Sequence, residues 1–433
     1  MPRYKLASFS ADVTIPLGHR CMGLLPTKSK KIVDPLFAHG FVLLGEDDPI
    51  VFVSVDWCEI RNGAYDRWRE VLAKAAGTKP ERVLVSSVHQ HDAPVSDIGA
   101  ENLLARVGLS GELFDFRFHE KTVQRMADAL KDSLQDAKPV THLGTSQAKV
   151  EKVASNRRVV SPDGQVTFSR GSNSGGNEFL RNADDGEIDP WLKTLSFWNG
   201  DKPLLAMHTY ATHPMSYYGR GGVSADFPGM ARARRQRDDG NVHQIYVSGC
   251  SGDVTAGKYN DGSPENRPLL ANRLYVAMKK AWEATTKHPL DTIAFRKTDL
   301  HLEFRPEERY TTTGLLKVLE DEKQTVIKRI YAAMSLSSRR RVATGQPIDF
   351  PCIDFGPAQL VLFPGESFVG YQLMAQKMRP DSFVVSAGYG ECWPGYIPTA
   401  AAFKDHFENH WLWVPPGCEK RIKKALQQVL KET

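Results

Sequence analysis

The sequence predicts an α/β fold in one large domain, residues 1–433, with mixed β-sheets and surrounding helices. Short apolar runs rich in β-branched residues recur along the chain, and several come in pairs separated by turn residues, as in hairpins. Amphipathic stretches of helical period separate other runs, which is typical of strand–helix–strand units. No linker divides the chain and no internal repeat is evident, so we expect a single domain.

In the N-terminal third, residues 37–44 and 50–56 form the first expected hairpin, because the intervening G-E-D-D-P has turn chemistry. A helix over 63–76 follows, and the apolar run 82–87 is the next strand. A strand, a helix and a strand in this order predict a parallel pair with a crossover. Ligands commonly bind at the ends of such strands.

The rest of the chain continues this alternation. We expect hairpins over 192–198 with 204–209, and over 353–355 with 359–363. Two further strands, 244–247 and 384–387, each lead into a loop that contains Gly. The expected helices cover 118–134, the segment that starts at Asp226 with Pro228 in its first turn, 268–282, 315–334, and the C-terminal stretch with Ile422, Leu426, Val429 and Leu430.

The composition, 41% hydrophobic and 25% charged residues, describes a soluble globular protein. The formal charge of +5 is mild and no basic run is interleaved with aromatic residues, so we expect no nucleic-acid partner. No apolar segment approaches about 18 residues, and the N-terminus has no apolar leader. We therefore expect no transmembrane segment and a cytoplasmic location, or secretion if a leader has been removed. The six cysteines are widely spaced, which leaves disulfides open.

Side chains of the kind that bind metals follow the predicted strands. One buried strand leads into His89 and His91, whose spacing of two residues places both imidazoles on the same side. His213, Glu366 and Tyr396 each follow a further apolar strand or its loop. Neutral nitrogens and a carboxylate around one ion, with a position left for water, make a hydrolytic zinc site. If these strand ends meet, we expect one Zn²⁺ per chain.

These residues lie in six short islands that together resemble the neutral (non-lysosomal) ceramidase family, in the same order over nearly the whole chain. S-V-H-Q-H-D-A-P at 87–94 looks like the family's T-H-T-H-S-G-P, and T-H-P-M-S at 212–216 looks like its H-P-x-S-M. The remaining matches are A-D-V-T at 11–14 with M-G at 22–23, Asp226 with G-D-V at 252–254, F-P-G-E at 363–366, and Y-I-P-T at 396–399.

The resemblance implies a divergent, bacterial-type, ceramidase-like catalytic domain. It implies a zinc-dependent amidohydrolase that cleaves linear N-acyl amides, such as the N-acylsphingosines of sphingolipid and lipid metabolism. The residues carried over as zinc ligands are His89, His213, Glu366 and Tyr396. Tyr396 either binds the ion or hydrogen-bonds the oxyanion. His91 would act beside the metal water as a proton shuttle or oxyanion partner, and Arg157, in a matching N-R pair, would contact the substrate.

Departures from the family pattern put the substrate in doubt. Glu408 replaces a second functional tyrosine, while Asp92 and Glu391 add carboxylates to two other motifs. We also expect the chain to be without the family's C-terminal β-sandwich. Carboxylates where an acyl chain would need apolar walls predict a substrate smaller or more polar than ceramide.

The alternatives are a zinc hydrolase of a small polar amide, lactam or ester, and a non-catalytic ligand-binding relative of the fold. The expected partner is a small-molecule or lipid amide, and the oligomeric state stays open.

Two segments have roles tied to this site. The stretch 161–186 is rich in Gly, Ser, Asn and Asp and follows Arg157, so we expect a mobile cover over the pocket. His406 and His410 lie four residues apart on a possible helix. They would be either a ligand pair or side chains at the pocket mouth.

Overall fold

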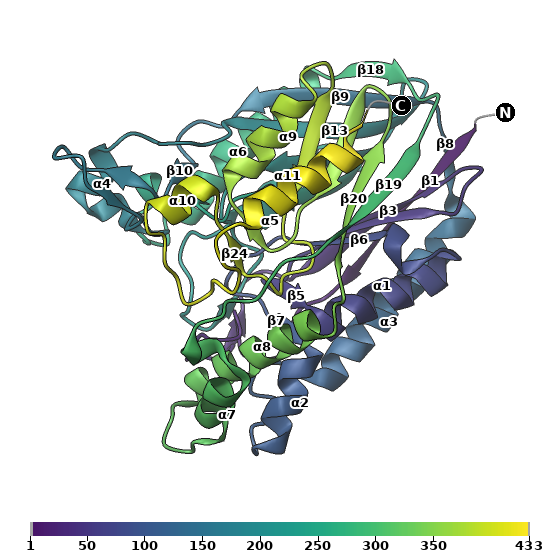
Figure 1. Ribbon diagram of the computed structural model, residues 1–433. Helices are drawn as coiled ribbons and strands as arrows, with labels where there is room; N and C mark the ends of the chain where they lie inside the picture. The colour runs from purple at the N-terminus through teal and green to yellow at the C-terminus, as the bar shows by residue number, and fades with distance from the viewer. Residues whose placement is uncertain (1–2, 432–433) are drawn as a thin grey trace.

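Three β-sheets form the body of the protein, and the computed structural model describes residues 3–431 of the chain (Figure 1). The first sheet has the order β6 (Val83–Ser87), β4 (Ile50–Val55), β3 (Phe37–Leu44), β1 (Tyr4–Asp12) and β8 (Lys138–Val140). The second has the order β16 (His243–Ser248), β14 (Lys202–Tyr210), β13 (Trp191–Asn199), β9 (His142–Lys149) and β18 (Thr286–Pro289). The third has the order β19 (Ala294–Leu300), β20 (Ile348–Asp354), β21 (Ala358–Leu362) and β23 (Phe383–Ala387).

The same unit, an antiparallel hairpin followed by a helix and a parallel strand, occurs once in each sheet. The three units are β3–β4–α1–β6, β13–β14–α5–β16 and β20–β21–α9–β23, with α1 at Asn62–Ala76, α5 at Asp226–Asp238 and α9 at Val369–Met378. The expectation of no internal repeat is therefore wrong for the structure. The sequence hides the repeat because the third strands share little beyond Val-Ser, at Val85-Ser86, Val247-Ser248 and Val385-Ser386.

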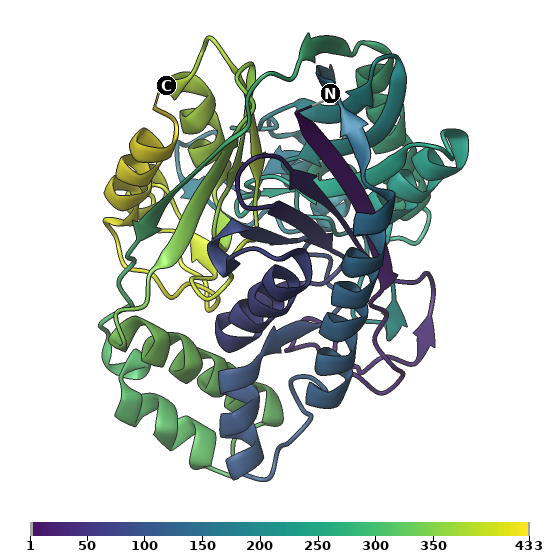
Figure 2. The ribbon, with the colours of Figure 1, turned by 90° about the vertical axis from the view of Figure 1, so that its right-hand side faces the viewer.

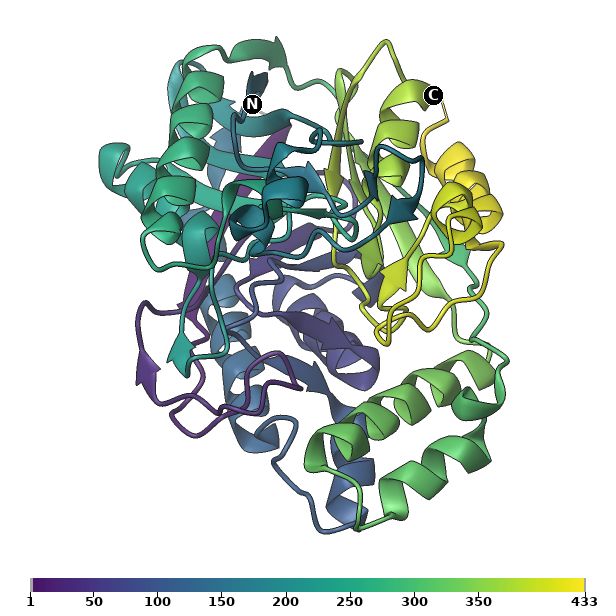
Figure 3. The same ribbon diagram turned by 90° about the vertical axis from the view of Figure 1, so that its left-hand side faces the viewer.

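Each sheet packs one face on a shared core and the other face on its own helices. Leu and Phe side chains of all three sheets meet in the shared core, where Phe52, Leu205 and Leu360 have no exposed surface. Burying such a side chain stabilises the fold by roughly 1.5–3 kcal/mol. The outer helices are α1 with α3 (Phe116–Ser133), α5 with α6 (Asn266–Glu283), and α9 with α11 (Cys418–Val429) (Figures 2 and 3).

The three predicted hairpins and the predicted parallel pair, β4 with β6, are confirmed. The further strands expected over 244–247 and 384–387 also form, as β16 and β23. The single helix expected over 315–334 is wrong, because the chain turns between α7 (Thr312–Glu320) and α8 (Val326–Ala343). The side chain of Thr325 accepts a hydrogen bond from the amide of Lys328, which caps a new helix. These two helices pack with α2 (Ile98–Arg106) in the lobe at the bottom of Figure 1.

Five two-stranded ladders lie outside the three large sheets. They pair β5 (Glu59–Arg61) with β7 (Val95–Asp97), β10 (Ser155–Asn156) with β17 (Val254–Thr255), β22 (Glu366–Ser367) with β24 (Tyr396–Ile397), β2 (Lys31–Ile32) with β15 (Gly222–Val223), and β11 (Val159–Val160) with β12 (Val166–Thr167). Two short helices, α4 (Glu178–Asn182) and α10 (Ala400–Lys404), lie next to the last of these ladders in Figure 1.

The predicted fold class, α/β with mixed sheets and surrounding helices, is confirmed. All six cysteines lie among the described residues and are buried and free, which settles the question of disulfides left open above. Within residues 3–431, no helix combines the length and apolar character needed to cross a bilayer.

Candidate metal centre and pocket

The third strands of the three units are tied together in a ring where they end. The hydroxyl of Ser86 donates to the carbonyl of Gly388 at 2.8 Å, and the amide of Gly388 donates to the carbonyl of Ser248 at 2.8 Å. The hydroxyl of Ser248 closes the ring by donating to the carbonyl of Val88 at 2.7 Å. The carboxyl ends of all three parallel pairs therefore meet at one place.

Equivalent residues of the three units, four positions after the shared Val, contact one another just beyond this ring. The rings of His89 and Tyr389 stack with centroids 4.2 Å apart, and the hydroxyl of Tyr389 lies 2.7 Å from that of Ser251. His89 and Tyr389 have φ angles of 74° and 53°, in the left-handed region that non-glycine residues enter at a cost. Tyr389 was not among the predicted site residues. Its place after Val-Ser, matching that of His89, is the signal that could have identified it.

Two histidines and a carboxylate form the centre of the site. Oε2 of Glu366 lies 2.9 Å from Nε2 of His213 and 3.4 Å from Nε2 of His89. The potential ligand atoms of the three residues all lie within 4.8 Å of one another, and all three side chains are buried. Ligands of a tetrahedral zinc, each about 2.0–2.2 Å from the ion, lie about 3.3–3.5 Å from one another. The distance from Glu366 to His89 falls in this range, and the shorter distance to His213 would lengthen by a few tenths of an ångström around such an ion.

The hydrogen bonds of the two imidazoles also fit a metal. Nδ1 of His89 lies 2.8 Å from the carbonyl oxygen of Cys58, and Nδ1 of His213 lies 2.6 Å from that of Ser251. A carbonyl only accepts, so each Nδ1 carries the proton and each Nε2 presents its lone pair to the centre. This is the arrangement in which protein histidines bind zinc.

The electrostatics of the three residues are coupled. Burial opposes ionisation of Glu366, but His89 and His213 outweigh it and hold the pKa of Glu366 well below its usual range. Burial also disfavours a charged His89, yet the Glu366 carboxylate raises its pKa. Burial and the nearby Arg157 lower the pKa of His213 to about 4. The centre thus holds a carboxylate that attracts positive charge and a neutral His213.

Tyr396 reaches the centre through a backbone ladder. In the parallel pair β22–β24, Glu366 lies opposite Tyr396, so their side chains share one face. An Nη atom of Arg157 donates to the Tyr396 hydroxyl at 3.4 Å. Burial raises the pKa of Tyr396. Gly252 lets the neighbouring loop approach this ladder, because a Cβ at Gly252 would lie 2.2 Å from the carbonyl oxygen of Glu366.

His91 lies beside the centre with both ring nitrogens free. Neither nitrogen has a hydrogen-bond partner among the described residues, although the side chain is buried. Its ring centroid is 5.3 Å from that of His89 and 6.2 Å from that of His213. Burial and these two imidazoles hold the pKa of His91 well below its ordinary value. His91 is therefore a neutral imidazole, which can accept a proton at one ring nitrogen.

The centre opens into a pocket of about 240 Å³. His89, His91, Glu366, Tyr396 and Arg157 line it together. The other lining residues are Met22, Cys58, Gly171, Ser172, Asn173, Met215, Tyr218, Asn409, His410 and Trp411.

The stretch 161–186 contributes the 171–173 wall of this pocket. Arg170 anchors the stretch: its buried guanidinium donates to the carbonyls of Asn156, Leu180, Ala183 and Asp184. The stretch is therefore a folded segment that supplies part of the pocket wall, and its role as a mobile cover stays a prediction.

Several residues expected at the pocket lie elsewhere. Glu391 lies 3.4 Å from Arg341, and Glu408 pairs with Arg305 at 2.9 Å. Asp92 accepts from the amide of Gly219 at 2.9 Å. None of these three carboxylates lines the pocket, so the argument that they add charge next to an acyl chain is wrong.

The expected histidine pair is also divided. His410 lines the pocket, whereas His406 does not. The two do not share a helix, because α10 ends at Lys404. Asp226 is buried too, but it accepts from Ser216 at the start of α5 and lies away from the pocket lining.

Solved structures of ceramidases share this fold. A ceramidase complexed with C2 matches with a TM-score of 0.71 and 14% identity, over 99% of this chain and 75% of that chain. The neutral ceramidase from Pseudomonas aeruginosa matches with a TM-score of 0.69 and 15% identity, over 99% of this chain and 74% of that one. No protein-family model and no curated protein matches the sequence. The chain has the neutral ceramidase fold, and the resemblance noted in its motifs is confirmed at that level.

Proposed function

We propose that this protein is a zinc-dependent hydrolase of linear N-acyl amides, with one zinc per chain. The observation that carries the proposal is the trio of His89, His213 and Glu366, whose spacing and fixed Nδ1 protons suit a single zinc. Tyr396 would complete the ligand set or hydrogen-bond the oxyanion from the same ladder. The ceramidase fold supports amide hydrolysis as the reaction class.

A zinc ion held by these residues would lower the pKa of water and polarise the amide carbonyl. The chain itself would supply the proton transfers and the charge stabilisation. His91 would accept a proton from the attacking water at a free ring nitrogen and pass it to the leaving amine. Arg157 and Tyr396, already joined at 3.4 Å, would hydrogen-bond the oxyanion that develops on the amide oxygen.

We also propose that the whole chain, residues 1–433, forms one ceramidase-like catalytic domain. The broad substrate class includes lipid amides of the sphingolipid kind as well as smaller N-acyl amides. The proposal is tested by removing metal with a chelator, restoring zinc, and assaying a panel of amides and esters. We expect amide cleavage that disappears with the metal and returns with zinc. Stoichiometric zinc without turnover of any amide or ester would instead favour a non-catalytic ligand-binding protein.

A further inference from the structure

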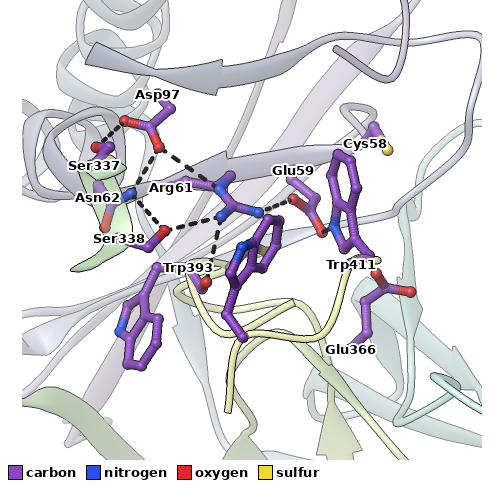
Figure 4. Close-up of polar contacts among 12 residues, drawn as sticks. Cys58, Glu59, Arg61, Asn62, Asp97, Ser337, Ser338, Glu366, Trp393 and Trp411 are labelled. Atoms are coloured by element: carbon purple, nitrogen blue, oxygen red, sulfur yellow. Dashed lines mark hydrogen bonds and ion pairs between the residues drawn. The ribbon is translucent and has the colours of Figure 1, made fainter. Parts of the chain in front are cut away.

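A buried charged pair lies directly behind the pocket and has no role in the proposed chemistry. Glu59 and Arg61 lie on β5 with fully buried side chains, and Nη1 of Arg61 donates to Oε2 of Glu59 at 2.9 Å (Figure 4). Asp97, opposite Arg61 in the β5–β7 ladder, lies 3.7 Å from the Arg61 Nε. Burying such charges costs free energy unless every group finds a partner.

Away from the pocket, this pair is fixed to helix α8. Nη2 of Arg61 donates to the hydroxyl of Ser338 at 3.0 Å, and the hydroxyl of Ser337 donates to Asp97 at 2.6 Å (Figure 4). The helix is part of the lobe formed with α2 and α7, so the pair rests on a packed base.

Toward the pocket, the pair holds the indole of Trp411. The remaining oxygen of Glu59, Oε1, accepts from Nε1 of Trp411 at 2.9 Å (Figure 4). The guanidinium of Arg61 lies 5.8 Å from the Trp411 ring and 4.3 Å from that of Trp413. The backbone of Trp411 is fixed as well, because its carbonyl accepts from the amide of Tyr396 at 3.0 Å.

Trp411 therefore forms a wall that cannot easily move. Its side chain is held by Glu59, its backbone by the strand that carries Tyr396, and the residue is only 4% exposed. Turning the indole aside would leave a buried carboxylate oxygen without a donor, which is costly. The pocket it borders, about 240 Å³, is smaller than the 300–1,000 Å³ or so of sites for drug-sized ligands. Polar side chains of Ser172, Asn173 and Asn409 line the same pocket.

We propose that Trp411, positioned by Glu59 and Arg61, limits the length of the substituents that the pocket accepts, so that the substrate is a compact amide with short substituents. The inference rests on the proposed amide hydrolysis and narrows its substrate class.

Two series of amides test this limit in the zinc-loaded protein. One varies the acyl group from acetyl through butanoyl and octanoyl to palmitoyl on a constant amine, and the other varies the alkyl group of the amine on a constant acetyl. We expect kcat/KM to fall at least about 10-fold toward the longest member in one series or both. Palmitoyl and long-alkyl amides cleaved as well as their short counterparts would overturn the proposal.

Three tryptophan variants assign the limit to Trp411. In Trp411→Ala, the ratio of long-chain to short-chain kcat/KM should rise at least about 10-fold, because the space of an indole is vacated. Trp411→Phe keeps most of the wall and should keep the limit. Trp282→Ala removes an indole that stacks on Trp198 outside the pocket, and it should leave the ratio unchanged. An unchanged ratio in Trp411→Ala would contradict the assignment.

Glu59 is inferred to be a positioning residue, and two variants test that role. Glu59→Gln removes one of the two acceptor oxygens but keeps one that can accept from the Trp411 indole, and it should retain the chain-length limit. Glu59→Ala removes the acceptor and should relax the limit, mainly through a lower KM for longer substrates at similar kcat. Equal limits in Glu59→Ala and the wild-type protein would show that Glu59 does not position the wall.

Binding measurements keep this proposal separate from the proposed reaction. Titration calorimetry of acetate, butanoate, octanoate and palmitate into the zinc-loaded protein follows product binding without turnover. Loss of affinity toward the long carboxylates, relieved in Trp411→Ala, would support the limit even if no amide were cleaved. Affinity that rises steadily to palmitate would overturn it, whether or not the protein proves to be an amidase.

Discussion

At the scale of single residues, the backbone decides how the proposed ligands face the centre. The carbonyl oxygens of Cys58 and Ser251 hold the Nδ1 protons of His89 and His213, which directs both Nε2 atoms toward Glu366. Among residues 3–431, no carbonyl pairs with His91 in this way and neither of its ring nitrogens has a hydrogen-bond partner. Two histidines separated by one residue therefore have different environments, which suits one to bind a metal and the other to transfer protons.

This difference predicts that His91→Ala retains zinc and loses turnover. Removing a proton-transfer group typically lowers kcat by about 10²–10⁴-fold. Zinc content and kcat measured on the same preparation test the prediction. His142→Ala, which removes an imidazole outside the pocket lining, serves as control and should preserve both. If zinc were lost together with the His91 side chain, His91 would be a ligand and its role as proton carrier would be wrong.

The sequence identified the centre better than the rest of the pocket. His89, His213, Glu366 and Tyr396 could be found because each follows an apolar strand and belongs to a motif. Trp411 and Glu59 could not, because their proximity depends on a contact between β5 and a loop 352 residues further along the chain. The carboxylates of Glu391 and Glu408 were misplaced for the same reason, since their arginine partners on α8 and before α7 come from distant segments.

At the scale of elements, local pattern predicted the hairpins, because turn residues and apolar runs are adjacent in sequence. The division into α7 and α8 was missed because apolar spacing continues through the turn, and only the cap at Thr325 marks the second start. The cover over the site was predicted from its length and composition. Its anchor, Arg170, was not, since a buried arginine that bonds backbone carbonyls has no distinct sequence pattern.

The anchor leads to a prediction about the cover. Arg170→Ala should loosen residues 161–186, since four carbonyls lose a charged donor, and each such bond contributes roughly 1.5–3 kcal/mol. We expect faster limited proteolysis within this segment and a fall of about 10-fold in kcat/KM.

Arg181→Ala is a matched control for the cover. Arg181 belongs to the same segment, but its side chain donates to a single carbonyl, that of Gly175, at the surface. In Arg181→Ala, the protease should cleave residues 161–186 at the wild-type rate. Equal protection of the wild-type protein and Arg170→Ala would show that Arg170 does not hold the cover in place.

At the scale of the whole molecule, three copies of one hairpin–helix–strand unit bring their strand ends to a single point. The ring formed by Ser86, Ser248 and Gly388 joins segments that are as far as 302 residues apart in the chain, so the site depends on the packing of all three sheets. The sequence does not reveal that these distant strand ends meet. It does show that all three strands end in a similar Val-Ser pair.

Packing of this kind also buries charge, which predicts a dependence of stability on pH. Burial raises the pKa of Glu391 to about 7, although Arg341 opposes the shift. Between pH 4.5, the pKa of Glu391 in the unfolded chain, and about pH 7, the folded chain holds the Glu391 proton more tightly than the unfolded chain does. The free energy of unfolding therefore falls as the pH rises through this range, and the whole loss is present above about pH 7. From about pH 6 to pH 8, the free energy of unfolding of the wild-type protein should fall by about 1 kcal/mol more than that of Glu391→Gln.

Urea unfolding at the two pH values measures this difference. Glu408→Gln serves as control, because its side chain is 59% exposed, and it should show the wild-type dependence. Parallel curves for Glu391→Gln and the wild-type protein would show that Glu391 does not titrate in this range.

The central claim, that strand ends from three sheets build one zinc centre, is tested most directly by titrating zinc into metal-free protein in a calorimeter. Wild-type protein should bind one zinc per chain, and His213→Ala should bind it at least about 100-fold more weakly. His288→Ala, which removes an imidazole on β18 outside the pocket lining, should bind zinc as the wild-type protein does. Equal zinc affinity in His213→Ala and the wild-type protein would contradict the claim.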